Sequence, residues 1–150
     1  HMNRGHEQEP IARQLYEFEQ FCDVGNGGFF SCGDMVGVSP DGLVGDNGMI
    51  EIKSVIETVH FANKKRGGID PAYKWQLFYE LKVTGREWND FVSFCATFPE
   101  GKRLFVSRIY AEQLKQEFAM IDSRMDEFSE AVESAKKNHH AVRWYGIERQ

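Results

Sequence analysis

The chain has 150 residues, a formal net charge of −5 and 41% apolar residues. This length favours one domain with one hydrophobic core, and the composition excludes disordered and collagen-like classes. The charge argues against a protein that binds nucleic acid by electrostatics alone. It does not exclude a nuclease, because metal-binding carboxylates add negative charge.

Targeting and redox signals are weak in this sequence. No apolar segment is long enough to span a membrane, and the N-terminal residues do not form a basic-plus-apolar leader. The first two residues resemble a cloning remnant, so we expect one domain over residues 3–150. Cys22, Cys32 and Cys95 are odd in number and widely spaced, which predicts reduced thiols rather than disulfides or zinc ligands.

Apolar periodicity and turn residues predict a helix, a hairpin, a second helix, two strands and a last helix. Pro10 suits the first turn of the first helix. Lys64, Lys65 and Arg66, here called the basic run, precede two glycines and favour a mobile loop. The expected ranges are helix 5–20, loop or irregular hairpin 23–34, strands 35–44 and 49–55, loop 61–70, helix 71–84, strands 89–98 and 103–110, and helix 111–137. This order predicts an α/β domain with a small central mixed sheet flanked by helices.

The hairpin holds the residues that indicate chemistry. Glu51 and Lys53 are two apart in a strand, so they share the face opposite Ile50 and Ile52. Asp41 would lie opposite Ile52, and a one-residue bulge would bring it beside Glu51. Two carboxylates this close repel one another, and Mg²⁺ would relieve the repulsion through oxygen ligands. The lysine would then act on the water that attacks a phosphodiester. The alternative is a polar turn beside a solvated strand face.

Ser39-Pro40-Asp41 and Glu51-Ile52-Lys53, with nine residues between Asp41 and Glu51, resemble the PD-(D/E)xK nuclease motif. Further segments resemble, in the same order, the phage lambda exonuclease family of YqaJ-type viral recombinases. These are Gly5–Arg13, Tyr73 with Gln76, Val83–Gly85 and Asp90–Val92. The resemblance runs from about Gly5 to the last helix and implies a restriction-endonuclease-like core.

The resemblance also implies roles for the matching positions. The catalytic group would be Asp41, Glu51, Lys53 and Gln76, and the metal ligands would be Glu9, Asp41, Glu51 and the Ile52 carbonyl. The metal would be Mg²⁺, with Mn²⁺ able to replace it. Lys53 would handle the nucleophilic water, and Glu9 would reach a second metal directly or through water.

The implied substrate is DNA, in double-stranded form. Ser39 and Tyr73 would lie near it, and the basic run would either contact phosphates or remain a solvated loop. The family pattern also suggests a single-strand annealing protein as a partner and a homo-oligomeric assembly, with no membrane contact. The expected location is the cytoplasm, that of a bacterial host if a phage encodes the protein.

Two departures from the family pattern concern DNA ends. The chain begins almost at the first motif helix, and Val59 stands where the family has an arginine. Both departures predict weak discrimination between phosphorylated and unphosphorylated 5′ ends. The leading interpretation is a Mg²⁺-dependent exonuclease of phage-type recombination. A structure-specific or nicking endonuclease and a non-catalytic DNA-binding module remain alternatives.

Overall fold

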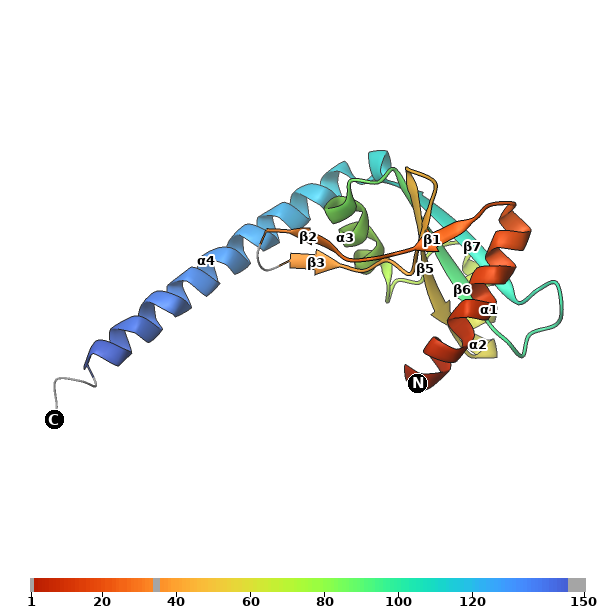
Figure 1. Cartoon of the computed structure of the whole chain (residues 1–150), viewed down its shortest axis with the longest axis horizontal. Helices are drawn as coiled ribbons and strands as arrows, with labels where there is room; N and C mark the ends of the chain where they lie inside the picture. The colour runs from red at the N-terminus through yellow and green to blue at the C-terminus, as the bar shows by residue number, and fades with distance from the viewer. Residues whose placement is uncertain (1, 34–35, 146–150) are drawn as a thin grey trace. The chain divides into compact units, whose positions relative to one another are not determined.

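The computed structural model describes residues 2–33 and 36–145 (Figure 1). The chain divides into two compact units, His1–Leu114 and Lys115–Gln150. The second unit contains the long helix α4 (Lys115–Tyr145). Within the described ranges, no helix combines the length and the apolar character needed to cross a bilayer.

The first unit is built on a five-stranded mixed sheet of order β1-β4-β5-β6-β7. Strands β5 and β6 are parallel, and the other neighbouring pairs are antiparallel. Strands β2 and β3 form a separate two-stranded ribbon. The elements of this unit are α1 (Met2–Gln20), β1 (Val24–Asn26), β2 (Phe30–Cys32), β3 (Val36–Val38), β4 (Gly42–Val44), β5 (Gly48–Ser54), α2 (Glu57–Arg66), α3 (Lys74–Thr84), β6 (Trp88–Phe94), β7 (Leu104–Tyr110) and the 3₁₀ helix η1 (Ala111–Gln113). The expected α/β class with a small mixed sheet is confirmed.

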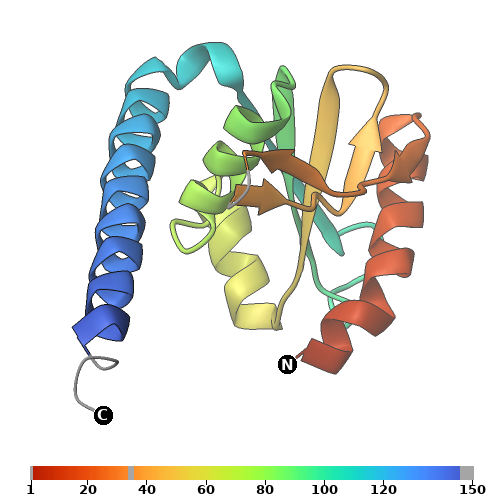
Figure 2. The same ribbon diagram turned by 60° about the vertical axis from the view of Figure 1, so that its left-hand side comes forward.

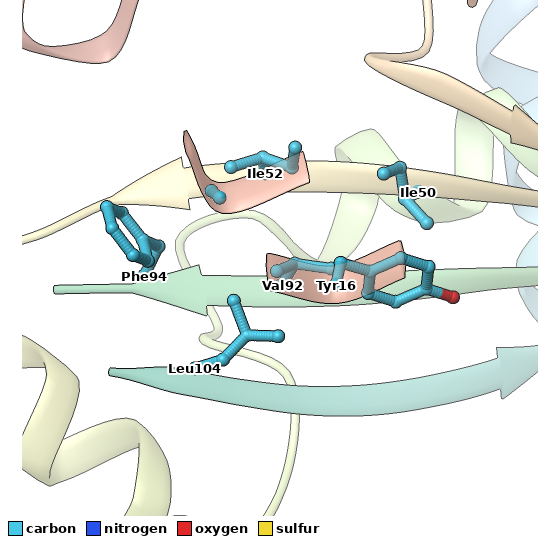
Figure 3. Packing of buried hydrophobic residues seen from close by; sticks show 7 residues of the cluster. Tyr16, Ile50, Ile52, Val92, Phe94 and Leu104 are labelled. Carbon is cyan, nitrogen blue, oxygen red and sulfur yellow. The ribbon is translucent and has the colours of Figure 1, made fainter. Parts of the chain in front are cut away.

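Helices cover both faces of the sheet, with α1 on one face and α2 and α3 on the other (Figure 2). Apolar side chains line the α1 face, and Figure 3 shows them packed together. Its buried members are Ala12, Tyr16, Ile50, Ile52, Val92, Phe94 and Leu104. Because strand side chains alternate, the residues between these on β5 and β6 point to α2 and α3. Burial of each large apolar side chain contributes about 1.5–3 kcal/mol.

The first helix is longer than predicted. It begins at Met2, so Pro10 lies inside α1 and not in its first turn. Proline has no N–H, so Pro10 cannot donate the helical hydrogen bond to the carbonyl of His6. Ala12 and Tyr16 follow at helical spacing and are fully buried, so tertiary packing on the sheet compensates for the lost bond.

The expected loop over 61–70 is wrong, because most of it belongs to α2. Gly67 ends this helix with a φ of 68°, and its N–H donates to the Asn63 carbonyl at 3.0 Å. The basic run forms the last turn, where positive charges favour the negative end of the helix dipole. His60 and Asn63 provide the buried side of the helix without any apolar side chain. Hydrophobic periodicity therefore gave no helical signal.

The hairpin register also differs from the expected one. Gly42 pairs with Ile50 and Leu43 with Met49. Continued by one residue, this register places Asp41 opposite Glu51, and no bulge is needed. The expected strand over 35–44 is split into β3 and β4 by the stretch 39–41, where proline cannot donate a ladder hydrogen bond. The range 23–34 contains β1, an edge strand of the main sheet, and β2 of the ribbon. Helix α3 starts three residues later than the predicted 71 and ends, as predicted, before Gly85.

Candidate active site

Asp41 lies at the open edge of β5. The β4–β5 ladder ends where Gly42 pairs with Ile50, so no described strand covers this edge beyond that point. There, Asp41 Oδ2 accepts a hydrogen bond of 2.7 Å from the Ile52 N–H. From α1, the Arg13 guanidinium donates a hydrogen bond to the Asp41 carbonyl oxygen. The carboxylate is therefore held beside the end of β5 through both its side chain and its backbone.

Two further contacts position the chain that leads into Asp41. Ser39 Oγ donates a hydrogen bond of 2.9 Å to the Gly28 carbonyl. Gly27 lies so near Pro40 that a Cβ would collide with the Pro40 carbonyl oxygen, so a glycine is required there. The hydroxyl of Ser39 thus has a structural partner, and its expected proximity to a phosphate stays a prediction.

Glu51 and Lys53 form a close pair on the α3 side of β5. Lys53 Nζ lies 2.7 Å from Glu51 Oε1, and Glu51 is only 3% exposed. Gln76 Nε2 donates to the same Oε1 at 2.7 Å. Lys53 Nζ also lies 4.7 Å from the centre of the Tyr73 ring, which stacks on Phe91. The fold therefore brings together the side chains of Glu51, Lys53, Tyr73 and Gln76.

A second buried glutamate extends this group, and sequence reasoning missed it. Gln76 Nε2 donates to Glu80 Oε1 at 3.0 Å, and Asn89 Nδ2 donates to Glu80 Oε2 at 2.9 Å. Glu80 is 2% exposed. The available signal was its place one turn after Gln76, within a stretch of α3 whose other buried residues are apolar. The Gln76 amide thus bridges two carboxylates from different elements.

Burial and mutual repulsion make these carboxyl groups reluctant to ionise. Burial raises the pKa of Asp41 to about 6 and that of Glu51 to about 8. Glu80 and Asp41 add to the rise at Glu51, and Lys53 opposes it. Burial also raises the pKa of Glu80, against hydrogen bonds from Asn89, Gln76 and the Glu51 carboxyl group. Burial lowers the pKa of Lys53, but Glu51 more than offsets this, so the pKa is raised and the amine stays charged.

The donor set fits a hard divalent cation. Glu51 Oε2 is buried and has no hydrogen-bond partner among the described residues. Asp41 offers a second carboxylate, and its charge raises the pKa of Glu51. In the part of the chain that is described, no three His, Cys, Asp or Glu side chains form a ready metal cluster. Two carboxylates suit Mg²⁺, which keeps several waters and also takes phosphate oxygens of the substrate as ligands.

The remaining predicted residues lie at the margin of this group or outside it. Glu9 projects from α1 and pairs with Arg13 at 3.9 Å, and its charge raises the pKa of Asp41. Its role at a second metal stays a prediction. In the basic run, Arg66 donates to the Asn63 side chain at 2.8 Å, and Lys64 and Lys65 line a separate hollow beside α2. Their contact with DNA also stays a prediction.

Comparison with known proteins identifies a family and similar solved structures. A family model described as the YqaJ-like viral recombinase domain matches residues 1–87. An alkaline exonuclease (LHK-Exo) from Laribacter hongkongensis is 34% identical, with a TM-score of 0.80 over 94% of this chain and 75% of that chain. Its complex with dAMP gives 34% and 0.79, over 94% and 74% of the two chains.

A phage-related exonuclease from Haemophilus somnus shares the fold, with 12% identity and a TM-score of 0.55 over 83% of this chain and 73% of that chain. No curated protein matches the sequence. The expected restriction-endonuclease-like core is confirmed by the solved structures. The family match covers more than half of the chain, and with the identity to LHK-Exo it shows that the chain belongs to the YqaJ-like viral recombinase family.

Proposed function

We propose that this protein is a Mg²⁺-dependent deoxyribonuclease that degrades linear duplex DNA from its ends. The observation that carries the proposal is the Glu51–Lys53 pair at 2.7 Å beside Asp41, with no hydrogen-bond partner for Glu51 Oε2 in the described ranges. A buried carboxylate with an unused oxygen is costly unless the site binds a further group. The similarity to LHK-Exo, an alkaline exonuclease that is 34% identical, supports the choice of DNA ends.

In this proposal each side chain has a distinct task. Asp41, Glu51 and the Ile52 carbonyl would hold Mg²⁺, which when bound supplies positive charge to stabilise the phosphate in the transition state. Lys53 carries its proton at neutral pH, so its ammonium would donate hydrogen bonds to the attacking water and to the phosphate. Gln76 would keep Glu51 in place through its amide.

Binding of the duplex would use contacts that do not depend on DNA sequence. The basic run would contact backbone phosphates, and Tyr73 would border the cleaved strand. Mn²⁺ would replace Mg²⁺, whereas Ca²⁺ would support binding with little cleavage because it accepts looser geometry. The family description, a viral recombinase, favours a role in phage-type recombination. A single-strand annealing protein would then take the strand left exposed.

One assay separates this function from its alternatives. Linear and covalently closed circular duplexes are incubated with the protein, either in Mg²⁺ or in chelator. We expect loss of the linear substrate alone, and only in Mg²⁺. Cleavage of the closed circle would indicate an endonuclease, and binding without cleavage of either substrate would indicate a non-catalytic module. Both outcomes contradict the proposal.

A further inference from the structure

A hollow outside the active site lies between α2 and the turn that joins β6 to β7. Its volume is about 830 Å³, and it combines exposed apolar side chains with three lysines and one carboxylate. The lining residues are Glu57, Phe61, Lys64, Lys65, Thr97, Phe98, Pro99 and Lys102. None of these residues belongs to the group around Glu51, although Glu57 follows Lys53 by only four positions.

Buried hydrogen bonds hold the two walls of this hollow together. His60 is fully buried, with Nδ1 at 2.9 Å from Ser93 Oγ and Nε2 at 3.0 Å from the Lys102 carbonyl. Its ring also meets that of Phe98 edge to face, with centroids 4.7 Å apart. The turn is closed by the Lys102 N–H, which donates to the Pro99 carbonyl at 2.9 Å. The hollow is therefore a preformed feature of the fold.

An exposed aromatic ring and lysines without an ion-pair partner among the described residues line the hollow. Phe61 is 61% exposed, although burial of a phenylalanine is favourable. Among the residues that the structure describes, Lys64, Lys65 and Lys102 form no ion pair. The three lysines outnumber the one carboxylate, so the hollow that Phe61 lines carries an excess of positive charge. A ligand that matches this surface must offer both a flat apolar face and repeated negative charge.

We propose that this hollow binds an unpaired stretch of single-stranded nucleic acid. A base would stack on Phe61, and the adjoining phosphates would contact the three lysines, which is how sequence-independent single-strand sites are built. Bases of a duplex are already stacked and paired, so they cannot present a face to this ring. An acidic peptide would match the lysines but would leave Phe61 without a stacking partner. The inference rests on the proposed DNA substrate, and it adds a site for the strand that is not paired.

The test is fluorescence anisotropy with a labelled oligothymidylate of about ten nucleotides in chelator, where hydrolysis is absent. Phe61→Ala should weaken binding about 5- to 150-fold, which is the range for loss of one stacked base. As a control, Phe18→Ala removes another exposed aromatic ring, 78% exposed on α1, and should leave the affinity unchanged. Substitution of Lys64, Lys65 and Lys102 by alanine should lower the salt slope of binding by about 2.

A second probe locates the base. An abasic strand of equal length keeps the phosphates but has no bases. It should bind the wild-type protein more weakly than oligothymidylate does. Phe61→Ala should bind the two strands with the same affinity. A Phe61→Ala affinity within twofold of wild type would overturn the inference. An acidic peptide that binds as tightly as the oligonucleotide and also needs Phe61 would overturn it in favour of a protein partner. If linear duplex is hydrolysed normally but Phe61→Ala binds oligothymidylate as tightly as wild type, only the single-strand site is refuted. If oligothymidylate binding depends on Phe61 but linear duplex is not hydrolysed, only the proposed activity is refuted.

Discussion

Two buried carboxylates on neighbouring strands differ in how their oxygens are hydrogen-bonded. Asp90 on β6 points to the α1 face, where both oxygens are satisfied. Tyr16 Oη donates at 2.6 Å, and the Arg108 guanidinium donates two bonds at 2.7 and 2.9 Å. Glu51 on β5 points to the α3 face, where it shares Oε1 between two donors and leaves Oε2 without a partner among the described residues.

The comparison separates a structural carboxylate from a functional one. Around Asp90 the positive charge and the hydroxyl compensate for the loss of water, so the group contributes to a stable core. Around Glu51, burial raises the pKa to about 8, and the neighbouring carboxylates of Glu80 and Asp41 add to the rise. Both faces of the sheet bury apolar side chains, and the α3 face in addition buries carboxylates that repel one another. Strongly perturbed ionisation of this kind gathers at active sites.

The largest expected effect is on hydrolysis. Lys53→Ala should lower the cleavage rate of linear duplex about 10³-fold or more, because it removes the ammonium that acts on the water and the phosphate. DNA binding should change little. Single-turnover cleavage with a fluorescent duplex measures the effect, and Lys136→Ala, in an exposed ion pair of α4, is the matched control. A Lys53→Ala rate within tenfold of wild type would rule out its catalytic role.

The next effect concerns the opposite face. Phe94 is 1% exposed and packs in the α1-side core, so Phe94→Ala should lower the free energy of unfolding by about 3–5 kcal/mol. Urea denaturation measures this loss. At a temperature where the variant remains folded, its rate per folded molecule should stay near the wild-type rate. A stable variant with lost cleavage would show that the two faces are not separate in their tasks.

A smaller effect is expected at Glu80, which we regard as a positioning residue. Glu80→Gln keeps the shape but replaces one acceptor by a donor, so Gln76 or Asn89 loses its partner. We expect a kcat about tenfold lower with unchanged KM, as for other residues that orient metal ligands. The charge of Glu80 raises the pKa of Glu51, so the acid limb of the pH–rate profile should move to lower pH. Exposed Glu19→Gln is the control, and an unmoved profile would leave Glu80 a purely structural residue.

The last expected effect is a gain in the free energy of unfolding. The pKa of Glu51 is about 8 in the folded protein against an ordinary value of 4.5, so the folded state holds a proton that the unfolded state releases. This contribution to stability is complete below pH 4.5 and is lost as the pH rises to 8. In chelator at pH 8, Glu51→Gln should therefore be more stable than wild type, by at most about 4 kcal/mol, and equally stable near pH 4.5. Thermal denaturation at the two pH values measures this, and a less stable variant at pH 8 would contradict it.

The contrast between the faces was readable from sequence in part. Glu51 and Lys53 alternate with Ile50 and Ile52, and period two is enough to assign the faces of β5. The partners of Asp90 were not readable, because Tyr16 and Arg108 come from distant elements and are joined only by the sheet order. Long-range contacts of this kind leave no local signal.

The errors have definite physical causes. The buried residues of helix α2 are a histidine and an asparagine, so the apolar pattern that indicates a helix is absent there and a loop is predicted instead. The hairpin register was off by one because the turn residues were counted as 45–48, whereas Gly48 already pairs with Val44. Glu80 was missed because a glutamate in a helix is ordinarily solvated, and only the fold brings Asn89 of β6 to it.

The most direct test of the central claim is a calorimetric titration of Mn²⁺ into the wild-type protein, Asp41→Asn and Glu51→Gln. On this account, the repelling carboxylates of the α3 face bind a cation. We therefore expect that the wild-type protein binds Mn²⁺ and that both variants lose this binding. Asp90→Asn, on the other face, should keep it in the folded fraction. Equal Mn²⁺ affinity in the wild type and in both active-site variants would contradict the account, because Glu51 Oε2 and Asp41 would then have no role in binding metal.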